Sequence, residues 1–259
     1  MDIPATYAIA AAASVAYMTL FFVVAQLKGD NGIVDVAWGV GFIVITIVTL
    51  AFHGDPGARA LLLAGLVVAW GLRLAIHIAI RNHGRGEDFR YAKWRQDWGD
   101  SFVVRSFLRV FMLQGFFLVV VASPIIFVTA DRQAIDLRWL DVIGVVVWLV
   151  GLLFEAIGDY QLMRFKRDPV NKGRVMDFGL WRYTRHPNYF GEATLWWGIF
   201  VVALSADHGY LSVIGPAILT FLLLRVSGVT MLEKKYSGDP AYAAYQRRTS
   251  SFIPLPPRN

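Results

Sequence analysis

The 259 residues are 56% hydrophobic and only 17% charged, which excludes an ordinary soluble domain and is typical of a polytopic membrane protein. No cysteine is present, so the sequence excludes disulfides, thiolate catalysis and zinc sites built on cysteine, and we expect no metal site. The formal net charge is +6, but the basic residues lie in short segments between apolar runs, and we therefore expect no nucleic-acid partner.

Seven apolar runs are long enough, or nearly so, to cross a bilayer, for which a helix needs about 20 residues. They cover residues 4–27, 33–52, 58–80, 106–129, 139–163, 189–205 and 210–232. The sixth run is short for a span unless its first turn lies at the interface. No soluble domain fits in the gaps, so we predict one all-α membrane domain over residues 1–259.

Lysine and arginine are concentrated in alternate gaps between these runs. Most of the 25 basic residues fall in four segments, namely 28–32, 81–105, 164–188 and 233–259. The other gaps, together with the run ends beside them, contain only Arg59, Arg132 and Arg138. The positive-inside rule makes the basic segments cytoplasmic. We therefore predict an outside N-terminus, a cytoplasmic C-terminus and one cytoplasmic face formed by the two long basic loops and the tail.

Several ionisable residues interrupt the apolar runs. They are Arg73 and His77 in the third run, Glu155 and Asp159 in the fifth, Glu192 in the sixth and Arg225 in the seventh. Such groups at membrane depth face the interior of a bundle and pair with one another. One interpretation is structural ion pairs, such as Arg225 with Glu192 or Glu155. The other is a polar cavity open to the cytoplasm, which their position near cytoplasmic helix ends indicates.

The second run opens with Asp35 and Trp38, which Gly39 and Gly41 follow. Asp35 is suited to capping this helix, since acids are favoured in a first turn, and Trp38 is suited to anchoring it at the interface. The functional alternative is a carboxyl group that burial keeps protonated, so that it donates to a carbonyl oxygen. The glycines allow close helix packing or ligand approach. Asp35 and Trp38 are our candidate catalytic residues.

The basic loops carry the Arg, Lys and Tyr side chains that a phosphorylated ligand requires. Segment 81–105 mixes basic, aromatic and glycine residues, and segment 155–192 is the densest in polar groups. Neither a Walker loop nor a G-x-G-x-x-G turn is present, and the strand–helix alternation of a Rossmann domain is absent. A phosphorylated cofactor would therefore be held by discrete side chains, and the alternative for these loops is lipid-headgroup binding.

The stretch Trp181–Glu192 combines directional polar groups at the start of an apolar run. Arg182 and Arg185 are donors suited to phosphate or carboxylate. Pro187 favours a helix start, which places Asn188 and Glu192 on one face. The alternative is a basic juxtamembrane loop that caps a helix and contacts lipid. Residues 242–254 are predicted as an amphipathic cytoplasmic lid or, alternatively, an interfacial tail.

The residues Arg185-His186-Pro187-Asn188-Tyr189-Phe190-Gly191-Glu192, preceded by Gly179-Leu180-Trp181, resemble the C-terminal signature of the membrane steroid 5α-reductase superfamily, most closely its bacterial branch. The likeness extends to Asp35–Gly39, Trp70–Leu74, Gly86–Tyr91, Gly158-Asp159, Leu232–Lys234 and Tyr245–Pro254. The same RHPxYxG pattern occurs in isoprenylcysteine carboxyl methyltransferases.

This resemblance implies a seven-helix bundle of the bacterial inner membrane that binds NADPH at its cytoplasmic side. The residues implied for cofactor contact are Asp159, Lys166, Arg185, Asn188, Tyr189, Glu192 and Arg225, with Arg73 and Arg90 near the pyrophosphate. The chain departs from the steroid reductases where they bind the substrate carbonyl. No Gln-Glu pair occurs in the second helix, where Asp35 is the nearest acid, and Trp70 stands where a tyrosine is expected.

We therefore expect an NADPH-dependent reductase of a C=C bond conjugated to a carbonyl in a steroid- or lipid-like substrate, with membrane lipid around it. The alternative enzyme is a membrane methyltransferase that uses S-adenosylmethionine. That cofactor has no phosphate, so the cation-rich loops favour the reductase. A third hypothesis, a non-enzymatic lipid-binding or transport protein, predicts a polar path between both faces rather than polar groups on one.

Overall fold

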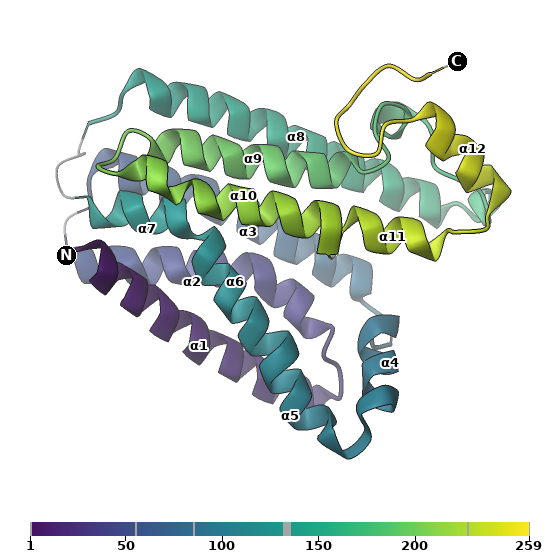
Figure 1. Ribbon diagram of the computed structural model, residues 1–259, viewed down its shortest axis with the longest axis horizontal. Helices are drawn as coiled ribbons and strands as arrows, with labels where there is room; N and C mark the ends of the chain where they lie inside the picture. Colours follow the sequence, from purple (N-terminus) through teal and green to yellow (C-terminus); the bar gives the residue numbers. More distant parts are fainter. Residues whose placement is uncertain (1, 55, 85, 132–135, 227, 259) are drawn as a thin grey trace. The chain divides into compact units, whose positions relative to one another are not determined.

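The computed structural model describes residues 2–54, 56–84, 86–131, 136–226 and 228–258 and is all-helical there, which confirms the predicted fold class (Figure 1). The strand-like pairing in this part of the chain is limited to an isolated bridge between Thr184 and Ser250. In chain order the helices and helical turns are α1 (Ile3–Lys28), α2 (Ile33–His53), α3 (Ala58–Asn82), α4 (Phe89–Trp98), η1 (Gly99–Ser101), α5 (Phe102–Ser106), η2 (Phe107–Met112), α6 (Leu113–Val121), α7 (Ser123–Ala130), α8 (Trp139–Arg167), η3 (Pro169–Asn171), η4 (Gly179–Arg182), α9 (Pro187–Ala203), η5 (Gly209–Val213), α10 (Ile214–Phe221), η6 (Leu222–Val226), α11 (Val229–Lys235) and α12 (Pro240–Arg248).

Six helical stretches in the described residues are long and apolar enough to cross a membrane, which makes the chain an integral membrane protein. They are Ile3–Lys28, Ile33–His53, Ala58–Asn82, Phe89–Val121, Trp139–Arg167 and Gly209–Lys234. The sixth predicted run is α9, a helix of 17 residues that is short for a span, as its sequence indicates. Arg85 and Arg132 of the charge pattern, and residue 227 of the seventh run, lie outside the described residues.

The fourth predicted run, 106–129, is not one helix. Its first part is a π-helical turn, η2, that continues into α6, and the helix ends at Val121. Ala122 has φ −70° and ψ 2°, after which α7 begins at Ser123 with Pro124 in its first turn. Proline lacks the N–H that an unbroken helix requires, so it fits the start of a new helix. All eight residues of α7 are buried.

The helices group into two compact units. Unit 1 comprises Met1–Asp141 and Val202–Ile214, and unit 2 comprises Val142–Val201 and Gly215–Asn259. In unit 1, α2 and α3 approach at Gly39 and Gly71, where a Cβ on Gly39 would lie 2.7 Å from the Gly71 carbonyl oxygen. This is the close helix packing that Gly39 was predicted to allow.

Unit 2 is built on a glycine seam between α8 and α9. Gly151 and Gly158 lie seven residues apart on α8, and Gly191 and Gly198 repeat that interval on α9. A Cβ on Gly191 would lie 2.4 Å from the backbone nitrogen of Glu155, so the two helices are in backbone contact. Figure 1 shows α8 and α9 running side by side. The seam positions the polar residues near the start of α9.

Candidate functional site

Asp159 and Asn188 meet where the seam brings the first turn of α9 against α8. A Cβ on Gly158 would lie 3.2 Å from the backbone nitrogen of Asn188, so the missing side chain lets the helices approach here. The Asn188 Nδ2 group donates to Asp159 Oδ1 over 3.1 Å. The Asn188 Oδ1 atom is buried and has no hydrogen-bond partner among the described residues. An orphaned buried acceptor of this kind is suited to a ligand N–H or O–H.

Glu192 lies one helical turn beyond Asn188 and is 8% exposed. Tyr189 stacks on His186 with ring centroids 5.5 Å apart and an interplanar angle of 8°. The predicted cofactor residues of the RHPNY stretch are therefore gathered at the start of α9, and all belong to unit 2.

The turn before this stretch is fastened to α8. The Trp181 Nε1 group donates to the Gly158 carbonyl oxygen over 3.1 Å, and its ring packs with Phe165 and Met176. The Leu180 backbone N–H donates to Gln161 Oε1 over 3.0 Å. These two hydrogen bonds to α8 thus fix the course of the chain before Arg185.

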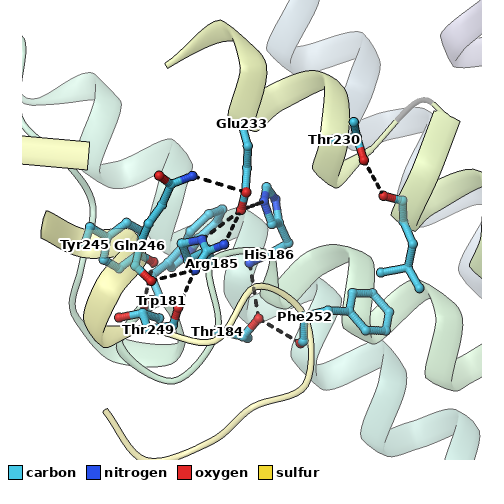
Figure 2. Close-up of polar contacts among 11 residues, drawn as sticks. Trp181, Thr184, Arg185, His186, Thr230, Glu233, Tyr245, Gln246, Thr249 and Phe252 are labelled. Atoms are coloured by element: carbon cyan, nitrogen blue, oxygen red, sulfur yellow. Dashed lines mark hydrogen bonds and ion pairs between the residues drawn. The ribbon is translucent and has the colours of Figure 1, made fainter. Parts of the chain in front are cut away.

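Arg185 is 9% exposed, and each of its guanidinium nitrogens has a protein partner. Nη2 and Nε lie 2.6 and 2.8 Å from Glu233 Oε1. Nη1 donates to the carbonyl oxygens of Gln246, over 3.1 Å, and Thr249. Figure 2 shows Arg185 enclosed by these groups from α11 and the C-terminal segment. The residue predicted to contact the cofactor therefore directs its charge into the protein.

Glu233 of α11 contacts several of the residues around Arg185. Besides Arg185, its carboxylate accepts from Gln246 Nε2 over 3.2 Å and lies 3.4 Å from His186 Nε2 (Figure 2). Its side chain is 19% exposed. A carboxylate with three polar neighbours of this kind holds the RHPNY stretch, α11 and α12 together.

The segment predicted as a lid folds onto the same stretch. The Tyr245 hydroxyl donates to the Trp181 carbonyl oxygen, and Tyr245 is 2% exposed. Burial raises the pKa of Tyr245 well above its ordinary value and the pKa of Tyr242 to about 12, so both phenols stay neutral and can donate. We name residues 249–258, which follow α12, the C-terminal strap.

Unit 1 contains a second polar cluster, at the start of α2. The Arg90 Nη2 atom lies 2.6 Å from Asp35 Oδ2, and the Tyr91 hydroxyl donates to Asp35 Oδ1 over 2.8 Å. Arg90 also pairs with Asp88 over 2.8 Å. Both oxygens of Asp35 are thus acceptors, so the donor role that we expected of Asp35 would require it to release a partner and take up a proton.

A neighbouring set fixes the loop before α4 to the loop before α2. Glu87 accepts from the Asn31 backbone N–H over 2.9 Å and from Arg95 over 2.8 Å. Partial burial acts to raise the pKa of Glu87, but these donors outweigh it and lower that pKa below its ordinary value. Burial likewise acts to raise the pKa of Asp88, but the contacts with Arg90 outweigh it and lower that pKa below its ordinary value. Both carboxylates are therefore ionised at neutral pH and hold α4 in place.

The remaining predicted residues are dispersed. Trp38 packs edge-on against Phe42 on α2, with ring centroids 5.2 Å apart. Arg73 is half-buried on α3, Lys166 is exposed in the last turn of α8, and Arg225 is exposed in the π-helical turn η6. The structure thus brings together Asp35 with Arg90, and Asp159 with Asn188, and leaves Lys166 and Arg225 at the surface.

Three participants were not assigned by sequence reasoning. Tyr91 and Glu233 lie in segments that carry the family resemblance, but nothing in the local pattern gave them a role. Gln246 stands in the predicted lid. An available signal was Glu233 itself, an acid at the end of an apolar run, which requires a cationic partner when part-buried.

Comparison with known proteins places the chain in a family. The family described as "Protein of unknown function (DUF1295)" matches residues 21–249. An uncharacterised protein of Schizosaccharomyces pombe is 25% identical over 223 residues, which are 76% of this chain and 63% of that protein. A protein of Ustilaginoidea virens named a probable O-methyltransferase is 38% identical over 53 residues, 20% of this chain and 18% of its own.

The chain spans less than two thirds of the length of either relative. No solved structure matches it. The family match runs through α1 to α12 and includes both polar clusters, from Asp35 to Glu233. Because this match covers most of the sequence, the chain belongs to the DUF1295 family.

Proposed function

We propose that the protein is an integral membrane reductase that uses NADPH to reduce a C=C bond conjugated to a carbonyl in a steroid- or lipid-like molecule. The proposal includes a place in the bacterial inner membrane and a cytoplasmic cofactor side. It is supported by the resemblance of the RHPNYFGE stretch and its companion motifs to the steroid 5α-reductase superfamily, of which we take the DUF1295 family to be the bacterial branch.

The single observation that carries the proposal is the Asp159–Asn188 pair. Its orphaned amide oxygen is a fixed acceptor inside the stretch that carries the resemblance. Asp159 holds the Nδ2 side of the amide, which leaves Oδ1 oriented for an amide or hydroxyl donor such as the carboxamide or ribose of a nicotinamide nucleotide.

The end of α8 and the segment that follows it supply cations for the phosphates of such a nucleotide. The Asp168 side chain is used to cap the Val170 backbone N–H over 3.0 Å, and Asp177 pairs with Arg248. Both acids are therefore occupied within the protein. Exposed basic residues lie in the last turn of α8 and in the segment between α8 and α9, namely Arg164, Lys166, Arg167, Lys172, Arg174 and Arg182. The donor set fits a phosphorylated dinucleotide, and bound NADPH would supply the hydride.

For the substrate carbonyl we retain Asp35 and add Tyr91. Tyr91 is a buried phenol whose hydroxyl already lies 2.8 Å from Asp35 Oδ1. Turned to a carbonyl oxygen, that hydroxyl would stabilise the negative charge that develops there, while Asp35 and Arg90 keep it oriented. Asp35 acts in this scheme through Tyr91, because both carboxylate oxygens accept.

The test measures nucleotide binding to the detergent-purified protein, with the thermal unfolding midpoint and NADPH fluorescence as the two readouts. We expect NADPH to raise the unfolding midpoint and Asn188→Ala to abolish the shift. Asn82→Ala on α3 is the matched control and should bind as the wild type does. Wild-type protein that shows no response to NADPH would contradict the proposal.

The second candidate is a membrane methyltransferase of the isoprenylcysteine carboxyl methyltransferase type. The observation in its favour is the 53-residue match to a probable O-methyltransferase. Its cofactor, S-adenosylmethionine, carries no phosphate, so a methyltransferase does not explain the exposed basic residues at the end of α8 as well as a reductase that binds NADPH does. A thermal shift with S-adenosylhomocysteine and none with NADPH would make this the preferred function.

A further inference from the structure

Every nitrogen of the Arg185 guanidinium is already engaged within the protein. Glu233 Oε1 takes Nε and Nη2, and two carbonyl oxygens take Nη1. Presenting this guanidinium to a phosphate would require breaking contacts to two other segments and leaving Glu233 part-buried beside His186. Loss of one partner of such a pair is strongly unfavourable. The arrangement assigns Arg185 to the protein rather than to a ligand.

The C-terminal strap has no helix of its own and depends on contacts to the stretch before α9. The Arg185 backbone N–H donates to the Ser250 carbonyl oxygen over 2.9 Å. The Thr184 hydroxyl donates to the Phe252 carbonyl oxygen over 2.8 Å. The Leu255 backbone N–H donates to the Tyr183 carbonyl oxygen over 3.0 Å. Arg185 therefore holds the strap through both its backbone and its side chain.

The strap in turn reaches the first turn of α9. The Phe252 ring lies 5.8 Å from that of Phe190, edge to face. The same Thr184 hydroxyl that binds the strap accepts from the His186 backbone N–H over 3.3 Å. Strap, loop and helix start are thus one connected set.

We propose that the Arg185–Glu233 ion pair is a latch that fastens the C-terminal strap and thereby positions the start of α9 for nucleotide binding. Arg185 is on this view a positioning residue and not a phosphate ligand. The inference rests on the proposed function only for the identity of the nucleotide; the latch itself is a property of the protein alone.

The first experiment measures backbone hydrogen exchange of the strap in the full chain, without nucleotide. Lysine cannot replace the forked contacts of Arg185, so Arg185→Lys should speed exchange in residues 249–258 by at least about tenfold. Glu233→Gln breaks the same pair and should do the same. Arg247→Lys, at an exposed arginine of α12, is the matched control and should leave exchange unchanged.

A variant outside the pair covers the case in which Arg185→Lys does not fold. Thr184→Val removes the hydroxyl contact to Phe252 without changing the latch, and it should also speed strap exchange. Unchanged strap exchange in Glu233→Gln, measured beside faster exchange in Thr184→Val, would overturn the latch.

The second experiment separates positioning from direct contact by NADPH titration. A latch predicts that Arg185→Lys and Glu233→Gln both weaken binding and that the double variant is no worse than Arg185→Lys alone, because both substitutions break the same ion pair. If Arg185 instead bound phosphate, Glu233→Gln would leave binding unchanged or strengthen it, since a negative charge near the ligand is lost. Wild-type protein that ignores NADPH would refute the proposed function and leave the exchange result, and the latch, standing.

Discussion

Two arginine–carboxylate pairs of unit 1 differ in how far solvent reaches them. The side chains of Arg59 and Asp141 are 0% and 1% exposed, with Nε and Oδ1 2.9 Å apart, so this pair can serve only the fold. The side chains of Arg90 and Asp35 are 24% and 17% exposed. A small molecule can reach the second pair and not the first. Exposure, rather than distance, therefore separates a structural ion pair from a candidate site.

The exposed pair gives a prediction for Asp35→Asn. The amide of asparagine is uncharged, so the ion pair with Arg90 is lost, and its oxygen is a weaker acceptor for Arg90 and Tyr91 than the carboxylate. We therefore expect the free energy of unfolding to fall by about 1.5–3 kcal/mol. If Asp35 orients Tyr91, the rate of enone-dependent NADPH oxidation should also fall, on the order of a hundredfold. Both quantities are measured on the detergent-purified protein. Asp97→Asn is the control, since Asp97 pairs with Lys93 at the surface, and it should change stability by less than about 0.5 kcal/mol.

Sequence reasoning named candidate site residues but not the partners that these residues have in the structure. Asn188 and Asp159 were chosen through a resemblance, and the structure pairs them because Gly158 admits the helix start. The partner of Arg185 is Glu233, 48 positions away. No local pattern encodes a contact over that separation, so an arginine suited to phosphate could not be distinguished from one that holds the chain.

At the scale of elements, the glycine seam decides how α8 and α9 cross. Glycine costs a helix about 1 kcal/mol relative to alanine, so its recurrence in a helix interior indicates packing rather than helix propensity. In unit 2 the seam gives backbone contact along both helices. It also brings the start of the short helix α9 against α8, where Asp159 and Asn188 pair.

The seam predicts that Gly191→Ala is harmful. The added Cβ would lie 2.4 Å from the Glu155 backbone nitrogen, which cannot move without shifting α8. We expect a loss of about 1–3 kcal/mol, measured as a lower thermal unfolding midpoint. Gly65→Ala in α3 is the control, because its Cβ would meet nothing within 4 Å, and it should be neutral or stabilising. Equal midpoints for both variants would refute close packing at the seam.

The elements themselves were largely predictable, because long apolar runs can only form helices in a bilayer. The exception was the run 106–129, where hydropathy continues through the break at Ala122. Pro124 was the available signal and was not used. Apolarity alone cannot mark a turn that is buried within the protein, since a buried turn is as apolar as the helices beside it.

At the scale of the whole molecule, the charge pattern still predicts the orientation in the membrane. The basic segments alternate with gaps that are nearly free of Lys and Arg, which assigns the C-terminus to the cytoplasm. Contacts between residues distant in sequence define the two compact units, and hydropathy carries no information about such contacts.

The absence of cysteine from the sequence makes the orientation testable with single reporters. Asp207→Cys, in the exposed turn between α9 and α10, should react in intact cells with a maleimide that does not cross membranes. Ser251→Cys, exposed in the strap, should react only after the cells are opened. The reverse pattern would invert the topology. The cysteine-free parent provides the background for both.

Unit 1 is discontinuous in the sequence, and this affects how the protein is made. The buried helix α7 packs on α1, α2 and α3, but it also packs on η5, which is synthesised some eighty residues later, after α8 and α9. During translation, one face of a helix that is fully buried in the folded protein therefore stays uncovered until Gly209–Val213 emerge from the ribosome. A nascent chain stalled before that point is the form that chaperones and quality-control proteases would encounter.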